Sequence, residues 1–314
     1  VIMRASNYPL VFRDRVVYAA NDPYAYVYWV ERGLQSGWGL SNIPAGLSDQ
    51  EPLTIVQLLY SAELAGGLGS HGAVLAWLPV VAAVVTVLSL YGFAREVSGD
   101  RRIALASAFV LAVLPVHVLR SALGFVDHHP FDYVWLVVTA WGLARAFGVE
   151  SIGPNRRTVL AVGLLGIGVA GSVLAWWAAA LLLLPIALAV TAGGALAARD
   201  ERSFSPPGLT TAAGVGFGSA LVAFTHVAWG WHDRILLAIP IALTVGVVGI
   251  VGASALWRRL SLPAWSFPLT GIAGIAAVAA GVYRFEPEEW ARISGQLARL
   301  FGTEEIAEVR SIFD

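Results

Sequence analysis

The sequence contains no cysteine and no lysine, and it is poor in charged residues of either sign. Only 13% of its 314 residues are charged, whereas a soluble domain carries about a quarter. The absence of cysteine excludes disulfides, thiolate metal sites and cysteine nucleophiles. Because all 20 basic residues are arginine, Schiff-base and P-loop lysine chemistry are excluded as well. A formal net charge of −1 offers no basic surface to nucleic acid. A soluble globular enzyme and a nucleic-acid binder are therefore both ruled out.

Apolar residues are abundant instead, at 57% of the chain with a mean hydropathy of +0.71. A membrane-spanning helix needs roughly 20 mostly apolar residues. The sequence has eight such runs, and we predict an all-α polytopic membrane protein with about eight transmembrane helices. The runs cover residues 71–95, 102–119, 131–150, 157–173, 175–197, 207–228, 235–257 and 263–284.

Arginine placement decides how the longest uncharged stretch is divided. Thr158 to Ala198 is a stretch of 41 residues without charge, long enough for one helix or for a hairpin of two. Arginines at its two ends share the cytoplasmic side under the positive-inside rule only if two spans lie between them. We therefore predict a hairpin. The predicted cytoplasmic set is Arg95, Arg101, Arg102, Arg145, Arg156, Arg157, Arg199, Arg202, Arg258 and Arg259, against Arg120 and Arg234 on the other side.

This parity divides the chain into three parts. Residues 1–70 form a first extracytoplasmic loop, residues 71–285 form the transmembrane bundle, and residues 286–314 begin a later extracytoplasmic loop. Within the first part we expect an amphipathic helix near Pro23–Leu34. The opening residues Val1–Arg4 do not resemble a signal peptide, and we expect the chain to be a piece of a longer protein. Four glycines on one predicted span (Gly163, Gly166, Gly168 and Gly171) predict a small-residue face for close helix packing.

The short link between the second and third spans carries the clearest cluster of polar residues. In it, Asp127 and His129 alternate, so an extended turn would point both side chains the same way. A carboxylate and an imidazole on one face make half of a divalent-cation site. The alternative is that Asp127 only caps the third span while His128 and His129 lie among lipid headgroups. His128 has no assigned role on either interpretation.

Two further acidic groups are candidates on the same side of the membrane. Asp22 precedes Pro23, which is also the ordinary signature of a helix start. Glu305 and Glu308 lie in the tail, where an acidic solvated helix face is the alternative. The predicted topology brings Asp22, the 127–129 pair and Glu308 to one side, where they could converge on one hard cation.

These motifs resemble those of oligosaccharyltransferase catalytic subunits of the archaeal type. Residues 120–129, Arg-Ser-x-x-Gly-x-x-Asp-x-His, resemble the second acidic motif of that family. Residues 21–24 resemble the end of its first acidic motif, and residues 305–308 resemble the glutamate motif of its fifth external loop. The resemblance implies a GT-C class membrane glycosyltransferase, and it covers essentially the whole chain as the N-terminal transmembrane part of such an enzyme.

The resemblance also implies a reaction. An oligosaccharide would move from a dolichyl phosphate or diphosphate to the asparagine amide of an Asn-x-Ser/Thr sequon in an acceptor protein. The same resemblance implies that membrane lipid surrounds the enzyme, that Mn²⁺ or Mg²⁺ is its cofactor, and that nucleic acid takes no part. The implied roles are metal binding for Asp22, Asp127 and His129, amide binding for Asp22 and Glu308, and contact with the donor phosphates or the acidic cluster for Arg120.

The sequence departs from the family pattern at several points. Ala20 replaces the first acid of an Asp-x-Asp form, Glu305 stands where Thr or Ser is usual, and the Trp-Trp-Asp-Tyr-Gly motif and C-terminal soluble domain are absent. We therefore expect the chain by itself to be inactive. Another polytopic glycosyltransferase that uses lipid-phosphate sugars remains an alternative. A transporter is a further alternative. It is disfavoured because no acidic or basic residue lies in the middle of a predicted span, where an ion or proton relay would need one.

Overall fold

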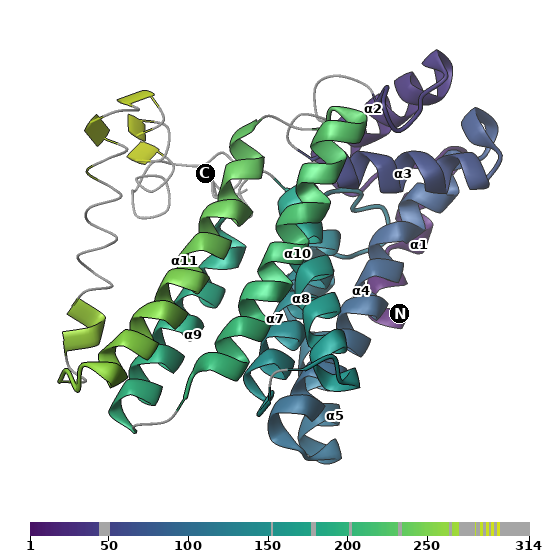
Figure 1. Ribbon diagram of the computed structural model, residues 1–314. Helices are drawn as coiled ribbons and strands as arrows, with labels where there is room; N and C mark the ends of the chain where they lie inside the picture. The colour runs from purple at the N-terminus through teal and green to yellow at the C-terminus, as the bar shows by residue number, and fades with distance from the viewer. Residues whose placement is uncertain are drawn as a thin grey trace.

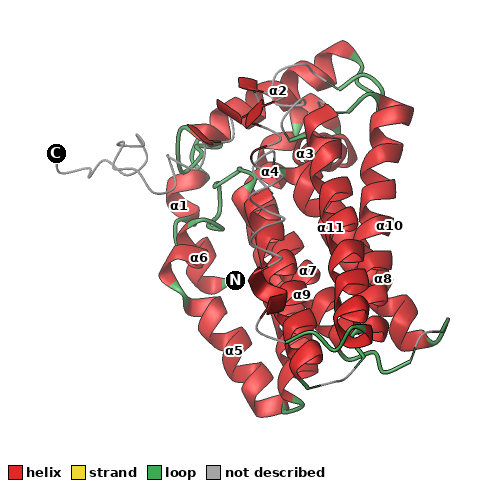
Figure 2. Cartoon of the chain, turned by 60° about the vertical axis from the view of Figure 1, so that its left-hand side comes forward, coloured by secondary structure: helices red, strands yellow, loops and turns green. Residues whose placement is uncertain are grey.

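The computed structural model describes residues 1–43, 51–151, 153–176, 180–200, 203–231, 234–263 and 266–269, and isolated residues between 280 and 295. Helices form nearly all of this described part, and its only β-type pairings are two isolated bridges (Figure 2). The predicted all-α class is therefore confirmed. Four short or amphipathic helices precede the bundle or interrupt it: α1 (Tyr8–Val11), α2 (Asp22–Ser36), α3 (Pro52–Leu64) and α6 (Pro115–Leu119).

Long apolar helices make up the bundle (Figure 1). They are α4 (His71–Ser98), α5 (Arg101–Val113), α7 (His129–Phe147), α8 (Arg156–Ala175), α9 (Ala180–Arg199), α10 (Ser205–Trp229) and α11 (Arg234–Arg259). Five of these, α4 and α8 to α11, are long and apolar enough to cross a membrane by length and composition alone. The predicted eighth span, 263–284, lies mostly outside the described residues.

The predicted second span, 102–119, is two helices in the structure and not one. Leu114 interrupts it with φ −61° and ψ 120°, an extended conformation between α5 and α6. The cause is Pro115, which lacks a backbone N–H and disfavours a helical conformation at the residue before it. The prediction of one continuous span was wrong here, although the proline that breaks the helix was visible in the sequence.

The uncharged stretch Thr158 to Ala198 is divided into two helices, as the arginine parity predicts. Helix α8 ends at Ala175, Trp176 has an extended backbone, and α9 begins at Ala180. The two helices are also separate candidate spans. A single break of a few residues therefore reverses the chain without any charged residue in the turn.

Helix α8 is the centre of the bundle and packs between α7 and α10. A Cβ built on Gly171 would lie 2.3 Å from the Trp135 ring of α7, and one on Gly166 would lie 2.4 Å from Phe217 of α10. Both contacts are too close for a side chain. Gly163 has nothing within 4 Å. The four glycines therefore do not share one packing face. Gly171 faces α7 and Gly166 faces α10, because α8 is buried on opposite sides, and Gly163 faces neither helix.

Helices α2 and α3, with the segment that leads into α2, form an N-terminal layer across one end of the bundle, at the top in Figure 1; the N-terminus itself lies lower in that view. Helix α2 confirms the amphipathic helix expected near Pro23–Leu34, while α3 was not predicted. Several hydrogen bonds tie this layer to the bundle, and two of them are long-range side-chain bonds to backbone carbonyls. Thr54 Oγ1 donates to the carbonyl of Ala175 at 3.0 Å, and Trp231 Nε1 donates to the carbonyl of Leu40 at 2.6 Å.

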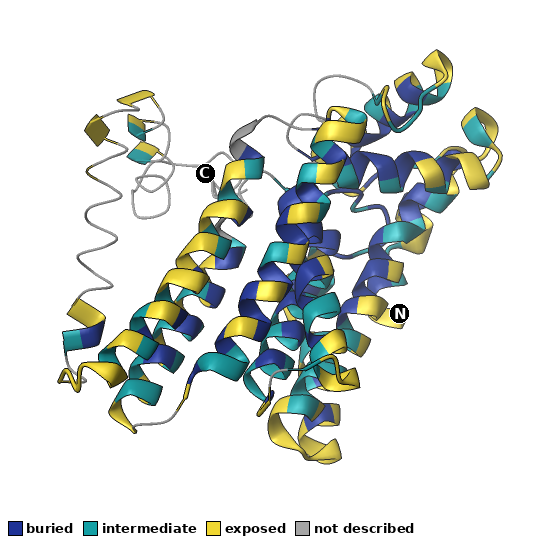
Figure 3. Cartoon of the chain, viewed as in Figure 1, coloured by how far each residue is buried: buried dark blue, intermediate teal, exposed yellow. Residues whose placement is uncertain are grey.

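The other end of the bundle carries those arginines of the predicted cytoplasmic set that the structure describes, and Arg202 lies outside the described residues. There Glu96 Oε2 lies 3.3 Å from Arg145 and its Oε1 lies 3.3 Å from Arg157, joining α4, α7 and α8. Between the two ends, the outward faces of the bundle helices are exposed (Figure 3) and bear large apolar side chains such as Phe109 and Val245. Such a surface is unfavourable in water and suits hydrocarbon, as expected of a multi-pass membrane protein.

Candidate metal centre and surrounding site

The loop between α6 and α7 holds the candidate site and is fixed by backbone hydrogen bonds to two distant segments. Gly124 donates to the carbonyl of Ala76 at 2.9 Å and accepts from the amide of Ala19 at 3.0 Å. Its φ of +82° is in the left-handed region that favours glycine. The loop is therefore clamped between α4 and the N-terminal layer, which explains the glycine of the motif.

Arg4 provides a second clamp that the sequence did not indicate. Its side chain is buried, with Nε donating to Ser121 Oγ at 2.8 Å and Nη1 donating to the carbonyl of Ala112 at 3.0 Å. Nη2 lies 2.6 Å from Nδ1 of His117. The amide of Leu123 donates back to the carbonyl of Arg4 at 2.9 Å. A single guanidinium thus joins the end of α5, α6 and the start of the loop.

The structure brings Asp127 and His129 together, as the alternation predicts. Nδ1 of His129 lies 2.8 Å from Oδ2 of Asp127, and the backbone amide of His128 donates to Oδ1 at 2.6 Å. Asp127 is only 1% exposed. Helix α7 begins at His129 with His128 as its N-cap. Asp127 therefore accepts from an amide at the start of α7 and also contacts His129, so capping alone does not describe its contacts.

His128 belongs to the same cluster and is held from two further directions. Its Nδ1 lies 2.5 Å from Oδ2 of Asp132, one helical turn later in α7. Its ring stacks on Trp176, with centroids 5.3 Å apart and planes inclined by 14°. The Asp132 contact is readable from the i, i+4 spacing, whereas the Trp176 contact joins residues 48 positions apart and is not. The other ring nitrogen of His128, Nε2, lies 3.6 Å from Oδ1 of Asp127.

The charges of the cluster are set by burial and by these neighbours. Burial acts to raise the pKa of Asp127, but the hydrogen bond from His129 and the charge of His128 outweigh it and hold that pKa below its usual range. Burial acts to lower the pKa of His128, but Asp132, Glu51 and Asp127 raise it to about 9. An ionised Asp127 therefore faces a protonated His128, and a cation that binds His128 must displace its proton.

Two buried residues from the N-terminal layer complete the surroundings. The Tyr26 hydroxyl of α2 donates a short hydrogen bond to Oε2 of Glu51, which precedes α3. Burial raises the pKa of the Glu51 carboxyl to about 7, although His128 and Tyr26 act to lower it. Burial and the charge of Glu51 also raise the pKa of Tyr26. Nothing in the sequence distinguished Tyr26 and Glu51 from the other residues of the predicted first extracytoplasmic loop.

The remaining predicted site residues lie in different settings. Asp22 is exposed in the first turn of α2, where its charge favours the helix N-terminus. The guanidinium of Arg120 lies 5.5 Å from the ring centroid of Phe125, within the same loop. Glu308 and the rest of its motif lie outside the described residues. The roles expected for these three residues remain predictions.

The described residues fit a divalent cation. One ligand atom from each of Asp127, His128 and His129 lies within 4.8 Å of the others, a group that differs from the predicted metal set in having His128 in place of Asp22. One carboxylate with two imidazoles suits divalent transition metals. Oδ1 of Asp132 is buried with no hydrogen-bond partner in the described part of the chain. This oxygen is an unpartnered acceptor beside His128.

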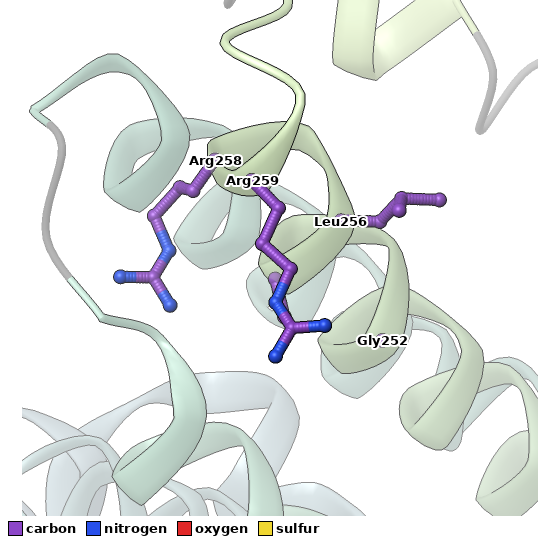
Figure 4. Close-up of a pocket in the computed structure, with 5 residues that line it drawn as sticks. Gly252, Leu256, Arg258 and Arg259 are labelled. Atoms are coloured by element: carbon purple, nitrogen blue, oxygen red, sulfur yellow. The ribbon is translucent and has the colours of Figure 1, made fainter.

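A hollow of about 550 Å³ lies at the opposite end of the bundle, at the end of α11 (Figure 4). Gly252, Ala255, Leu256, Arg258 and Arg259 line it. These residues offer no carboxylate or imidazole, and the paired arginines follow the charge asymmetry of the bundle. The chemistry of the chain is therefore concentrated at the end covered by the N-terminal layer.

Comparisons with known sequences agree with the motif resemblance. Residues 54–199 match the family described as oligosaccharyl transferase STT3, N-terminal. Dolichyl-phosphooligosaccharide-protein glycotransferase 2 of Archaeoglobus fulgidus is 28% identical over 179 residues, which are 55% of this chain and 30% of the relative. The chain thus spans less than a third of the length of this relative.

Solved structures of Archaeoglobus fulgidus oligosaccharyltransferase share the fold. The enzyme AglB in complex with an inhibitory peptide and a dolichol-phosphate matches with a TM-score of 0.80 at 19% identity, over 99% of this chain and 39% of that one. A complex with zinc and sulfate matches at 0.73 and 20% identity, over 91% and 39%. A complex tethered to an acceptor peptide containing the NVT sequon matches at 0.73 and 21% identity, over 90% and 36%. The predicted resemblance to the N-terminal part of archaeal oligosaccharyltransferases, a family of glycosyltransferases, is confirmed.

Proposed function

We propose that this chain is the donor-binding and metal-binding membrane part of an archaeal-type oligosaccharyltransferase. The complete enzyme would transfer an oligosaccharide from a dolichyl phosphate or diphosphate to asparagine in Asn-x-Ser/Thr sequons of proteins. The observation that carries this proposal is the buried cluster of Asp127, His128 and His129, which lies inside the motif that resembles the family. A dolichol-phosphate and a sequon peptide bound to the related enzyme support the two substrate classes.

The chemistry has two difficulties that the proposed site addresses. An amide nitrogen is a weak nucleophile because its lone pair is delocalised, and the leaving group is a highly charged phosphate. A bound divalent cation supplies a Lewis acid that neutralises charge on departing phosphate oxygens. Asp127 and His129 would hold that cation, and in the predicted metal set Asp22 would join them from the start of α2. The zinc in the related structure supports a metal at such a site, with Mn²⁺ or Mg²⁺ as the expected ion.

The other predicted residues would act on the substrates. Carboxylates of Asp22 and Glu308 would accept the N–H groups of the acceptor amide and orient its nitrogen for attack. The planar guanidinium of Arg120 suits the donor phosphates or the acidic cluster. The apolar outer surface of the bundle would accommodate the lipid carrier, which explains why so hydrophobic a chain would act on sugars.

The site would face the extracytoplasmic side of the cell membrane. The described arginines of the predicted cytoplasmic set lie at one end of the bundle, and the Asp127 cluster lies at the other. Under the positive-inside rule, the end with the arginines is cytoplasmic. A cysteine introduced beside the cluster and labelled by an impermeant maleimide in intact cells would test this orientation.

The test of function is glycan transfer by the complete protein with Asp127→Asn. A fluorescent peptide with one Asn-x-Thr sequon and extracted dolichyl-linked oligosaccharide serve as substrates. Asp127→Asn keeps the shape of the side chain and removes its charge. Because loss of an outer-shell partner alone costs about 10–100-fold at metal sites, we expect loss of this ligand charge to lower transfer by about a hundredfold or more. EDTA should abolish wild-type transfer, and Mn²⁺ should restore it.

The matched control is Asp14→Asn, an exposed acid of the N-terminal layer outside the cluster, which should transfer normally. Normal transfer by Asp127→Asn would contradict the proposed site. If the wild-type protein consumes the lipid-linked sugar without glycosylating any sequon peptide, another glycosyltransferase that uses lipid-phosphate sugars becomes the better assignment.

A further inference from the structure

We propose that Tyr26 and Glu51 are a positioning pair that fixes the Asp127 carboxylate for metal binding from the side of the N-terminal layer. The inference rests on the proposed function, in that it takes Asp127 to be a metal ligand. Tyr26 and Glu51 would not touch the substrate or the metal ion. They would act through the orientation of the Asp127 carboxylate.

Burial and contacts place the pair directly behind the ligand. Tyr26 is 4% exposed, Glu51 is 5% exposed and Asp127 is 1% exposed. The Tyr26 hydroxyl donates to Oε2 of Glu51. The same hydroxyl interacts with the Asp127 carboxylate by charge and by hydrogen bonding. One phenol therefore lies between two buried carboxylates.

The pair comes from the N-terminal layer, whose buried side chains also pack in one apolar cluster with Leu123 and Val126 of the loop. Tyr26 lies one helical turn after Asp22, so α2 presents both residues on one face. Glu51 immediately precedes α3, and α2 and α3 pack against each other. The N-terminal layer therefore contributes to the cluster through Tyr26 and Glu51, in addition to any role of Asp22.

A purely structural role does not account for this arrangement. A buried acid costs stability unless it is paired, and an apolar pair of the same size would hold two helices at least as well. Glu51 interacts electrostatically with His128, Asp127 and Asp132. Outer-shell groups of this kind typically change metal affinity or activity by about 10–100-fold when they are removed.

The test measures metal affinity and transfer together in the complete protein with Tyr26→Phe. This variant removes only the hydroxyl. Mn²⁺ binding is followed by electron paramagnetic resonance of the free ion, without substrate. We expect the dissociation constant for Mn²⁺ to rise about tenfold or more. Transfer at low Mn²⁺ should fall by a similar factor and recover when Mn²⁺ saturates the site. Recovery by excess metal is a response that a fold defect would not give.

The matched control is Tyr28→Phe, on the same helix but 53% exposed, with a hydroxyl that accepts only from Arg32. It should bind Mn²⁺ as the wild type does. Glu51→Ala and Glu51→Gln provide a second test, because glutamine can still accept from the Tyr26 hydroxyl. We expect Glu51→Ala to weaken Mn²⁺ binding about tenfold and Glu51→Gln to regain most of it.

The outcomes separate this inference from the proposed function. If Tyr26→Phe and Glu51→Ala bind Mn²⁺ normally while Asp127→Asn does not, the positioning pair is refuted and the metal site stands. If Asp127→Asn also binds Mn²⁺ normally, the proposed function fails first. Loss of transfer that excess Mn²⁺ does not restore, in a variant with unchanged Mn²⁺ affinity, would likewise overturn the positioning role.

Discussion

Arg4→Met tests whether the N-terminal residues fix the loop of the site. Arg4 makes three side-chain contacts, with Ser121, the carbonyl of Ala112 and His117, while being 4% exposed. Hydrogen bonds from a charged group contribute about 1.5–3 kcal/mol each. Among the described residues no carboxylate pairs with this guanidinium. The substitution therefore also removes the cost of burying its charge, which offsets part of the lost hydrogen-bond energy. We expect a net destabilisation of about 3 kcal/mol, similar to breaking other buried charged networks.

The assay is the loss of the monodisperse peak in detergent after heating. A change of 1 kcal/mol shifts the melting temperature by roughly 2–4 °C in chains of 150–250 residues, so we expect a fall of about 5 °C or more. Arg4→Lys should not restore stability, because an ammonium cannot reproduce the planar fork of three contacts. Arg13→Met is the control, since Arg13 is exposed and bonds only the nearby carbonyl of Leu10. An Arg4→Met protein that melts with the wild type would refute the clamp.

Two further predictions concern the bundle. Gly171→Val should destabilise the protein by about 1–3 kcal/mol through overpacking, because a Cβ there meets the Trp135 ring; Gly163→Val, with open space around it, should melt within error of wild type. Glu96→Gln removes the carboxylate shared by α4, α7 and α8, but its partner Arg145 is partly exposed. We expect a loss of about 1 kcal/mol or less, measurable as a small shift in melting temperature that high salt reduces; a large, salt-insensitive loss would contradict this.

Local signals predicted most of the helices. The start of the first span at His71 matches α4, and the hairpin follows from arginines at the ends of an uncharged stretch. These features depend on composition and on charge sidedness, which each segment carries by itself. The one break that was missed, at Leu114, was also local, since a proline follows it.

Within the site, sequence distance decided what could be predicted. Asp127 and His129 are two residues apart, so their contact followed from alternation in one turn. His128 and Asp132 are one helical turn apart and could have been paired on the same ground. Asp22 was grouped with them because the arginine pattern predicts the same side of the membrane for all of these residues. A shared side of the membrane does not predict a contact.

The sequence by itself therefore determined the class of the protein, its helices, the charge asymmetry of its two ends and the motif around Asp127. Only the tertiary structure decided what surrounds that motif. Arg4 and Ser121 are 117 positions apart, and Tyr26 and Glu51 are 25 apart, on separate helices. Such contacts arise from how the N-terminal layer packs on the bundle, and no periodicity or spacing in one segment encodes a neighbour contributed by another.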